Sequence, residues 1–205
     1  MSCFKLPPDM GKKFKRLMDI SFSFLGLISL SWLIIFAWIL STINTRKNGI
    51  FFQSRVGRRG RVFKIYKIRT MKDSKRYFTS ITHKNDPRIT SFGSILRKLK
   101  IDELPQLWNV MIGDMSFVGP RPDVPGYADK LNDTDKSIIL SVRPGITGPA
   151  TLKYRNEEKI LSMKNDPIKY NNEIIYPDKV IINKNYIENW SLIKDLKFLL
   201  KTLFN

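Results

Sequence analysis

Residues 20–43 contain no charged side chain and are dominated by Phe, Leu, Ile and Trp. At a helical rise of about 1.5 Å per residue, a helix of this length crosses a hydrocarbon core of roughly 30 Å. The stretch is too long for a secretory signal, and no small-x-small cleavage site follows it. We therefore expect a retained membrane helix, with the rest of the chain folded beside a bilayer.

Basic residues crowd both ends of this apolar segment. Those before it are Lys12, Lys13, Lys15 and Arg16, and those after it are Arg46, Lys47, Arg55, Arg58, Arg59 and Arg61. A helix that simply crosses the membrane carries its excess of Lys and Arg on the cytoplasmic side. Two basic ends indicate that both face the cytoplasm, so that the segment enters the bilayer and returns as a re-entrant helix. Ser29 and Ser31 would help to bend it by hydrogen bonding to preceding carbonyls. A single spanning helix is the alternative.

The chain of 205 residues has a formal net charge of +18, from 36 Lys and Arg against 18 Asp and Glu. This excess predicts polyanionic partners: nucleic acid, anionic lipid headgroups or phosphorylated substrates. Cys3 is the only cysteine, which excludes an internal disulfide and a Cys-based metal site. His83 is the only histidine. Any zinc or Ser-His-Asp scheme would rest on it alone, and we expect an ordinary loop residue.

From residue 46 onward the pattern is that of one folded domain. Strands are predicted at 49–52 and 61–68, around a tight basic turn at 56–60, and helices at 91–99, 102–111, 132–142 and near 166–173. Gly113 suits a helix C-cap, and Pro120, Pro122 and Pro125 predict a rigid loop. The expected class is α+β: a small, mainly helical cytosolic domain with a short β-hairpin. The expected division is a basic amphipathic segment (1–18), a re-entrant membrane helix (19–45) and a catalytic domain (46–205).

The chain ends in a predicted amphipathic helix, residues 191–204. Its apolar stripe is Leu192, Ile193, Leu196, Leu199, Leu200 and Leu203. We expect this stripe to pack on the core. The alternative is an interfacial helix that lies on the membrane, with Lys194, Lys197 and Lys201 on its other side. Residues 1–15, with four lysines among apolar residues, admit the same alternative.

Asp102 and Glu103 form an adjacent acidic pair at a predicted helix start, in a chain with twice as many basic as acidic residues. On spacing alone Asp102 is an N-cap, because Asp is a preferred cap and Pro105 falls in the first turn. A helix N-terminus also attracts anions and lowers the pKa of a carboxylate placed there. The pair would thus stay ionised, as nucleophile or metal ligands, and capping is compatible with catalysis.

Several other segments carry Lys and Arg at positions where the backbone is restricted, either on a predicted strand or next to prolines. One predicted strand alternates basic and apolar side chains, which places Lys67 and Arg69 on one face. Arg121 stands between two prolines, and Arg143 comes directly before a Pro-Gly pair. Arginines held rigidly suit bidentate binding of phosphate. Each segment alone is compatible with a solvated surface, whereas together they indicate a site for phosphorylated substrates.

Taken in order along the chain, these segments resemble one family. The matching segments are Lys15–Asp19, Phe52–Gly57, Lys64–Met71, Asp86–Thr90, Ile101–Asn109, Gly113–Pro122, Val142–Gly148, Tyr186–Ser191 and Asp195-Leu196. In this set and order they resemble the bacterial sugar transferases, the monotopic phosphoglycosyl transferases that start lipid-linked glycan assembly. The resemblance covers essentially the whole chain.

The resemblance implies an enzyme that transfers a sugar-1-phosphate from a UDP-sugar to undecaprenyl phosphate, or another polyprenyl phosphate, and releases UMP. Asp102 would be the nucleophile that carries a covalent phosphosugar. Glu103 would assist through Mg²⁺ or by handling protons, and both carboxylates would be metal ligands. The implied phosphate partners are Lys67, Arg69, Arg121 and Arg143. The implied location is the bacterial cytoplasmic (inner) membrane, in contact with its lipids, with the catalytic domain facing the cytoplasm.

One position departs from the family pattern. Where the family usually breaks its membrane helix at a Ser-Pro pair, this chain has Ser31-Trp32, so a bend would rest on the serines and Gly26. The rival interpretation is a membrane-tethered protein that binds nucleic acid or lipid without catalysis. It explains the net charge but neither the acidic pair nor arginines fixed between prolines, so we expect no nucleic-acid partner. The sugar, the glycan pathway and the oligomeric state, including a homodimer, stay open.

Overall fold

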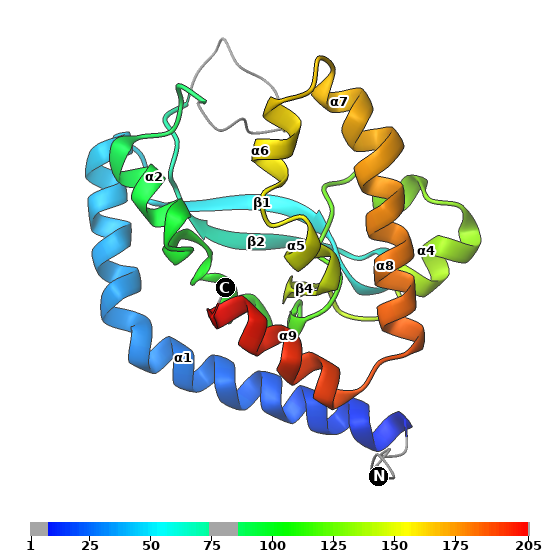
Figure 1. Cartoon of the computed structure of the whole chain (residues 1–205). Helices are drawn as coiled ribbons and strands as arrows, with labels where there is room; N and C mark the ends of the chain where they lie inside the picture. Colours follow the sequence, from blue (N-terminus) through cyan, green and yellow to red (C-terminus); the bar gives the residue numbers. More distant parts are fainter. Residues whose placement is uncertain (1–7, 74–85, 205) are drawn as a thin grey trace.

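The computed structural model describes residues 8–73 and 86–204. The helices are α1 Pro8–Thr45, α2 Ser91–Lys98, α3 Gln106–Ile112, α4 Asp133–Ile139, α5 Pro149–Lys153, α6 Glu157–Ser162, α7 Pro167–Tyr170, α8 Tyr176–Glu188 and α9 Leu192–Phe204, and the strands are β1 Ile50–Val56, β2 Val62–Ile68, β3 Ser116–Val118 and β4 Gly145–Thr147. A mainly helical domain with little sheet confirms the predicted class (Figure 1). The predictions for Cys3, His83 and residues 1–7 lie outside the described residues.

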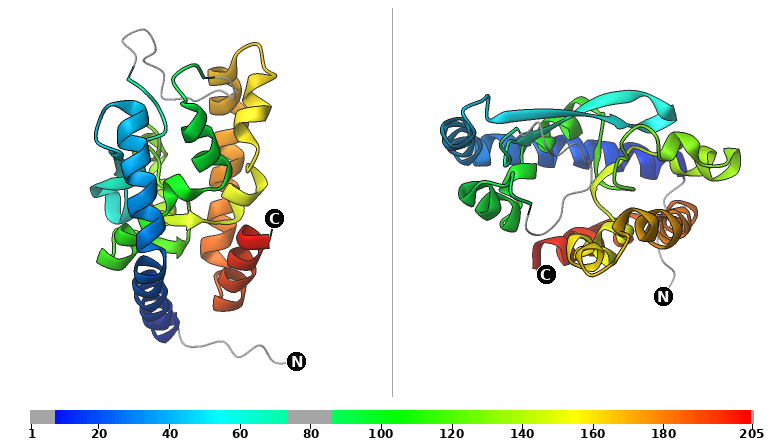
Figure 2. Two further views of the ribbon diagram at one scale, coloured as in Figure 1. Left: turned by 90° about the vertical axis from the view of Figure 1, so that its left-hand side faces the viewer. Right: turned by 90° about the horizontal axis from the view of Figure 1, so that it is seen from above.

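β1 and β2 form the predicted hairpin. They pair antiparallel in a register that runs from Ile50↔Ile68 to Val56↔Val62, so β1 is longer than the sequence predicted. Figure 2 shows this hairpin on one side of the molecule and α6 to α9 on the opposite side. A second pair, β3 and β4, is parallel and was not predicted, because three-residue strands carry too short a pattern. Gly145 permits it: a Cβ there would lie 2.1 Å from the Gly119 nitrogen.

α1 is one continuous helix that changes direction. In Figure 1 its darker-blue amino-terminal arm runs along the bottom of the domain, and its lighter-blue carboxyl-terminal arm rises along one side. Within α1 the Ser29 and Ser31 hydroxyls donate to the carbonyls of Gly26 and Ile28 at 3.4 and 2.9 Å, which confirms the predicted bonding to preceding carbonyls. Such bonds bend helices, and here no proline is needed.

α1 turns its small and polar residues toward the domain and its large apolar residues outward. Asp19, Ser23, Ala37, Ser41 and Thr45 are buried. The exposed apolar side chains include Phe14, Leu17, Phe24, Leu25, Ile28, Trp32, Ile35, Phe36, Trp38, Ile39 and Ile43. Within the described residues, Met10–Thr45 is the one helix long and apolar enough to cross a membrane. This is the reverse of a helix that faces water, and it suits contact with lipid.

α9 also turns polar residues toward the domain and most of its apolar residues outward. Asp195 is buried, the ring of Phe198 packs edge-on against Tyr186 at 5.9 Å, and the hydroxyls of Thr202 and Thr147 are 2.7 Å apart. Most of the predicted apolar stripe lies outside: Ile193, Leu196, Leu200 and Leu203 are 48%, 41%, 53% and 76% exposed. The expectation that the stripe packs on the core is therefore wrong for these four, because a buried polar network holds the helix instead.

The other helices differ from prediction mainly in their bounds. α2 is confirmed, Gly113 caps α3 at φ +96°, and α4 is shorter than predicted, with Asn132 as its N-cap. The helix expected near 166–173 begins as α7 after Asp166 and continues through a π-helical turn, Asn171–Ile175, into α8. α5, α6 and most of α8 were not predicted, since this polar region lacks a clear apolar period.

Candidate active site

Asp102 and Glu103 lie in a 3₁₀ turn, Ile101–Glu103, between α2 and α3. Lys100 before it has a left-handed backbone (φ 58°), and α3 begins only after Pro105. Pro105 has no N–H to bond the carbonyl of Ile101, which accepts instead from Leu104 at 3.2 Å. The predicted helix 102–111 therefore starts late, and the prediction that Asp102 caps it is wrong.

Glu103 brings together cations from two distant segments. Its Oε1 accepts from Lys67 Nζ of β2 at 3.0 Å and from Arg121 Nη2, in the loop after β3, at 2.5 Å. The Glu103 side chain is 13% exposed. Although burial opposes ionisation, Arg121 and Lys67 hold the pKa of Glu103 well below its usual value. Glu103 is thus a fixed negative charge at neutral pH, which does not suit a proton carrier.

Asp102 has the opposite electrostatic character. It is buried, and its Oδ1 has no hydrogen-bond partner within the described part of the chain. Burial, and then the neighbouring charge of Glu103, raise its pKa from 3.8 to about 6. The predicted lowering is wrong, because the residue is not at a helix N-terminus and receives no compensating donor on that oxygen. About nine in ten such carboxyls are still ionised at pH 7, and a poorly solvated carboxylate is a good nucleophile.

Arg69 and Arg143 lie away from this cluster. Arg69 Nε donates to the carbonyl of Asn48 at 2.8 Å, and its guanidinium stands 5.3 Å from the ring centre of Phe51. β2 ends at Ile68, so the strand alternation that grouped Arg69 with Lys67 no longer applies. Arg143 Nε donates to the carbonyl of Gly113 at 2.8 Å, at the end of α3. The structure thus places Lys67 and Arg121 beside the acidic pair and does not place Arg69 and Arg143 there.

Arg55 adjoins the cluster, although no sequence pattern assigned it to the site. From β1 its Nη1 donates to the Pro122 carbonyl at 3.0 Å, while its buried Nε has no partner in the described structure. Burial, and then the charge of Arg121, lower its pKa to about 10. Asp123 next to this arginine accepts from the Tyr176 hydroxyl at 3.0 Å, and burial raises its pKa. Arg55 lies in the segment Phe52–Gly57, which resembles the family, and that resemblance is the sequence signal that could have identified it as a site residue.

Ion pairs from the carboxyl-terminal half border the site. Arg97 of α2, whose charge also acts on Asp102, pairs with Glu158 of α6. Lys179 of α8 pairs with Glu157 of α6 at 2.7 Å. Arg97 thus acts on Asp102 and also joins α2 to α6, so the acidic pair lies near the contact between these two helices. A carboxylate with a free oxygen among Lys67, Arg121 and Arg97 can attack a phosphorus atom whose oxygens these cations bind.

The residues present are compatible with a Mg²⁺ ion for which the substrate supplies some of the ligands. The described residues contain no group of three or more side chains arranged as metal ligands. Mg²⁺, however, commonly takes one or two carboxylates together with substrate phosphates and waters. The unpartnered Oδ1 of Asp102, next to Glu103, is compatible with this mode of coordination. The presence of the metal ion stays a prediction.

Comparison with known proteins gives the chain its family. The family model described as bacterial sugar transferase matches residues 10–205. The chain belongs to the bacterial sugar transferase family. This confirms the resemblance and the prediction that the chain is a transferase.

Relatives of this sugar transferase differ in length. It is 37% identical to the galactosyl transferase CpsE of Streptococcus agalactiae, over 92% of this chain but 41% of that protein. It is 35% identical to the exopolysaccharide production protein ExoY of Sinorhizobium fredii, over 92% of this chain and 83% of that protein. It is also 35% identical to the undecaprenyl-phosphate galactose phosphotransferase of Salmonella typhimurium, over 92% of this chain and 39% of that protein. The chain thus spans about two fifths of its longer relatives.

Proposed function

We propose that this sugar transferase moves a sugar-1-phosphate from a UDP-sugar to undecaprenyl phosphate, or a related polyprenyl phosphate, with release of UMP. The observation that carries the proposal is the free, buried Oδ1 of Asp102 beside Glu103, Lys67 and Arg121. The names of two relatives support the acceptor: undecaprenyl-phosphate galactose phosphotransferase, and UDP-glucose:undecaprenyl-phosphate glucose-1-phosphate transferase of Klebsiella pneumoniae, which is 36% identical. The second name supports a UDP-sugar donor.

In the first step, Asp102 Oδ1 attacks the phosphorus that bears the sugar. A carboxylate–phosphorus bond forms, the phosphoanhydride bond breaks, and UMP leaves with the bonding electrons. In the second step, an oxygen of the lipid phosphate attacks the same phosphorus and frees the carboxylate. Each step exchanges one P–O bond for another, and neither needs a proton carrier. Glu103 therefore serves to hold Lys67 and Arg121, which bind the phosphate oxygens.

Mg²⁺ held by Asp102, Glu103 and substrate phosphates would supply neutralising positive charge when bound. Without such charge, two anionic phosphates would have to approach a carboxylate against Coulomb repulsion. Arg121 adds a planar fork that pairs with phosphate oxygens, and Lys67 adds a compact charge from the other side.

We also propose that α1 is re-entrant, and that it places the catalytic domain on the cytoplasmic side of the bacterial inner membrane. The bent helix, its outward apolar residues and its two basic ends support this topology. To test it, Cys3 is replaced, and single cysteines near Lys12 and Lys47 are treated with a membrane-impermeant thiol reagent in oriented membranes. The same sidedness is expected for both positions, and opposite sidedness would establish a spanning helix.

The catalytic proposal is tested with the purified full chain in detergent. The protein is incubated with Mg²⁺, undecaprenyl phosphate and a panel of UDP-sugars, and UMP is measured. We expect release from at least one donor by the wild type and by Asp133→Asn, a matched change of an exposed aspartate in α4. Asp102→Asn should release none. Wild type indistinguishable from Asp102→Asn on every donor would sink the proposal and favour a binding protein without catalysis.

A further inference from the structure

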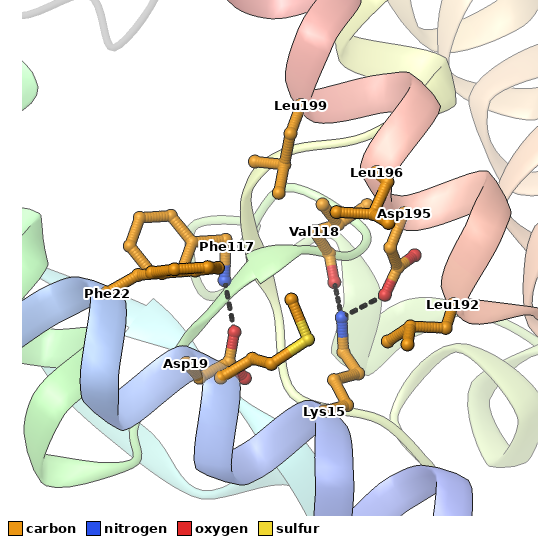
Figure 3. Close-up of a pocket in the computed structure, with 10 residues that line it drawn as sticks. Lys15, Asp19, Phe22, Phe117, Val118, Leu192, Asp195, Leu196 and Leu199 are labelled. Atoms are coloured by element: carbon orange, nitrogen blue, oxygen red, sulfur yellow. Dashed lines mark hydrogen bonds and ion pairs between the residues drawn. The ribbon is translucent and has the colours of Figure 1, made fainter.

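A partly buried ion pair outside the active site joins segments from the two ends of the described chain. Lys15 Nζ of α1 lies 2.5 Å from Asp195 Oδ2 of α9 and donates to the Val118 carbonyl of β3 at 3.0 Å (Figure 3). The Tyr186 hydroxyl and the Trp190 indole N–H also donate to Asp195, at 2.6 and 3.0 Å. Asp195 is only 4% exposed. The Lys15 side chain is 21% exposed, so the pair is partly buried, with its negative end fully enclosed.

The attraction within such a pair is largely offset by the free-energy cost of removing its charges from water, so the pair adds little net stability. Removing two charges from water costs several kcal/mol, by order of magnitude, and their attraction roughly offsets this only in good geometry. Its clearest effect is therefore on position. Asp19, one helical turn after Lys15, accepts from the Ser116 hydroxyl at 3.2 Å and from the Phe117 N–H at 3.1 Å. Together Lys15 and Asp19 hold all three residues of β3 against α1.

β3 leads directly into the loop that carries Arg121. Gly119 N–H donates to the Thr147 carbonyl at 2.9 Å, and Gly145 N–H donates to the Pro120 carbonyl at 2.8 Å, so the loop continues the β3–β4 pairing. Arg121 follows within the same rigid stretch and reaches Glu103. A shift of β3 would therefore move the Arg121 guanidinium relative to the acidic pair.

The other parts of the site are also tied to α1. Arg16 donates to the carbonyls of Val110 and Met111, at 2.7 and 2.9 Å, at the end of α3. The Ser41 hydroxyl of the second arm donates to the Arg69 carbonyl, just after β2 and two residues after Lys67. α1 thus forms hydrogen bonds to the end of α3, to the residue after β2 and to β3, which adjoin the segments that supply Asp102, Lys67 and Arg121.

We propose that Lys15 and Asp195 are positioning residues, which hold β3 so that Arg121 meets the phosphate beside Asp102. The seating of the membrane helix thereby sets the geometry of catalysis. This inference rests on the proposed function for its kinetic consequence, whereas the positioning of β3 itself does not.

The kinetic test is a double-mutant cycle on the full chain in detergent. UMP release from the active UDP-sugar is compared for wild type, Lys15→Met, Arg121→Ala and the double variant. Burst amplitudes count the active molecules, which separates lost geometry from lost folding. We expect Lys15→Met to lower kcat/KM by about 10- to 100-fold in the wild type, since a misplacement of about 1 Å can cost that much. In the Arg121→Ala background it should cost less than about twofold, because coupled residues are not additive.

Two variants guard against a folding defect. Tyr186→Phe removes one hydrogen bond to Asp195 and should give a smaller loss that again vanishes in Arg121→Ala. Lys169→Met, the same change at an exposed lysine of α7, should leave kcat/KM unchanged. Equal losses in both backgrounds, or full activity of Lys15→Met, would overturn the inference.

Amide hydrogen exchange tests the same inference without activity. Lys15→Met should speed exchange at Gly119 and Gly145 by at least about tenfold while the β1–β2 hairpin stays protected, because only β3 loses its support. Unchanged protection at these two amides would overturn the positioning role. If the wild type released no UMP, the proposed function would fail, and hydrogen exchange would still decide this inference.

Discussion

The pH dependence of the first half-reaction should report the unusual environment of Asp102. A carboxyl with a pKa of about 6 is about 90% ionised at pH 7 and about 10% at pH 5. The rate of UMP release from the donor alone should therefore fall about tenfold between these values. An ordinary aspartate, with a pKa of 3.8, would stay about 94% ionised at pH 5 and give an almost flat profile.

The magnitude follows from burial. Raising the pKa from 3.8 to about 6 corresponds to about 3 kcal/mol against the charged form in the folded protein. Desolvation is the largest cause, the charge of Glu103 adds to it, and Lys67 opposes both. Lys67→Met should therefore move the midpoint of the profile to higher pH, whatever it does to the absolute rate. Lys169→Met removes an exposed lysine of α7 and should leave the midpoint unchanged.

The assay is a single-turnover, rapid-quench measurement of UMP formation at subsaturating UDP-sugar and Mg²⁺, without acceptor lipid, from pH 4.5 to 8. Below saturation the profile reports the ionisation of the free enzyme, which is the form whose Asp102 environment the structure describes. A midpoint near 4 would refute the assignment of a desolvated nucleophile. A midpoint near 6 that Lys67→Met leaves in place, or lowers, would refute the electrostatic account of this site.

Three further predictions concern stability. Because the folded protein binds the Asp102 proton more tightly than the unfolded chain, this residue makes stability fall as pH rises from about 4 to 6. Asp102→Asn should thus have a Tm at pH 7 no lower than the wild type, and a lower Tm by calorimetry would contradict this. Asn109→Ala should lower the free energy of unfolding by about 2 to 3 kcal/mol in urea titrations, since its buried amide bonds two backbone groups of β2; a loss below about 0.5 kcal/mol would contradict it. Gly145→Ala should cost about 3 kcal/mol or prevent folding, because its Cβ would meet Gly119; a Tm equal to that of the wild type would contradict it.

Sequence patterns predicted the elements whose formation depends mainly on neighbouring residues, such as single helices and strands. The alternation of residues 61–68 predicted β2, and the apolar period gave α2 and α9 nearly to the residue. The serines of the apolar segment predicted hydrogen bonds that the structure contains. The outward face of α9 was not predictable in the same way, because an apolar stripe buries itself in either a core or a membrane.

The site depended on contacts that the sequence does not encode locally. Glu103 meets Lys67 and Arg121 across 36 and 18 residues, and Lys15 meets Asp195 across 180. Arg121 and Arg143 have similar sequence contexts, since both adjoin prolines. Only the tertiary structure shows that Arg121 lies beside Glu103 and that Arg143 does not. The raised pKa of Asp102 likewise depends on burial, which a short motif cannot show.

The covalent intermediate is the central claim, and mass spectrometry of the digested protein tests it most directly. The full chain is incubated with Mg²⁺ and its UDP-sugar without acceptor lipid, quenched in acid and digested. The account predicts a sugar-phosphate mass increment on the peptide that contains Asp102, absent in Asp102→Asn and discharged by undecaprenyl phosphate. UMP that forms only when the lipid is present, with no adduct on any peptide, would show direct transfer and contradict the account.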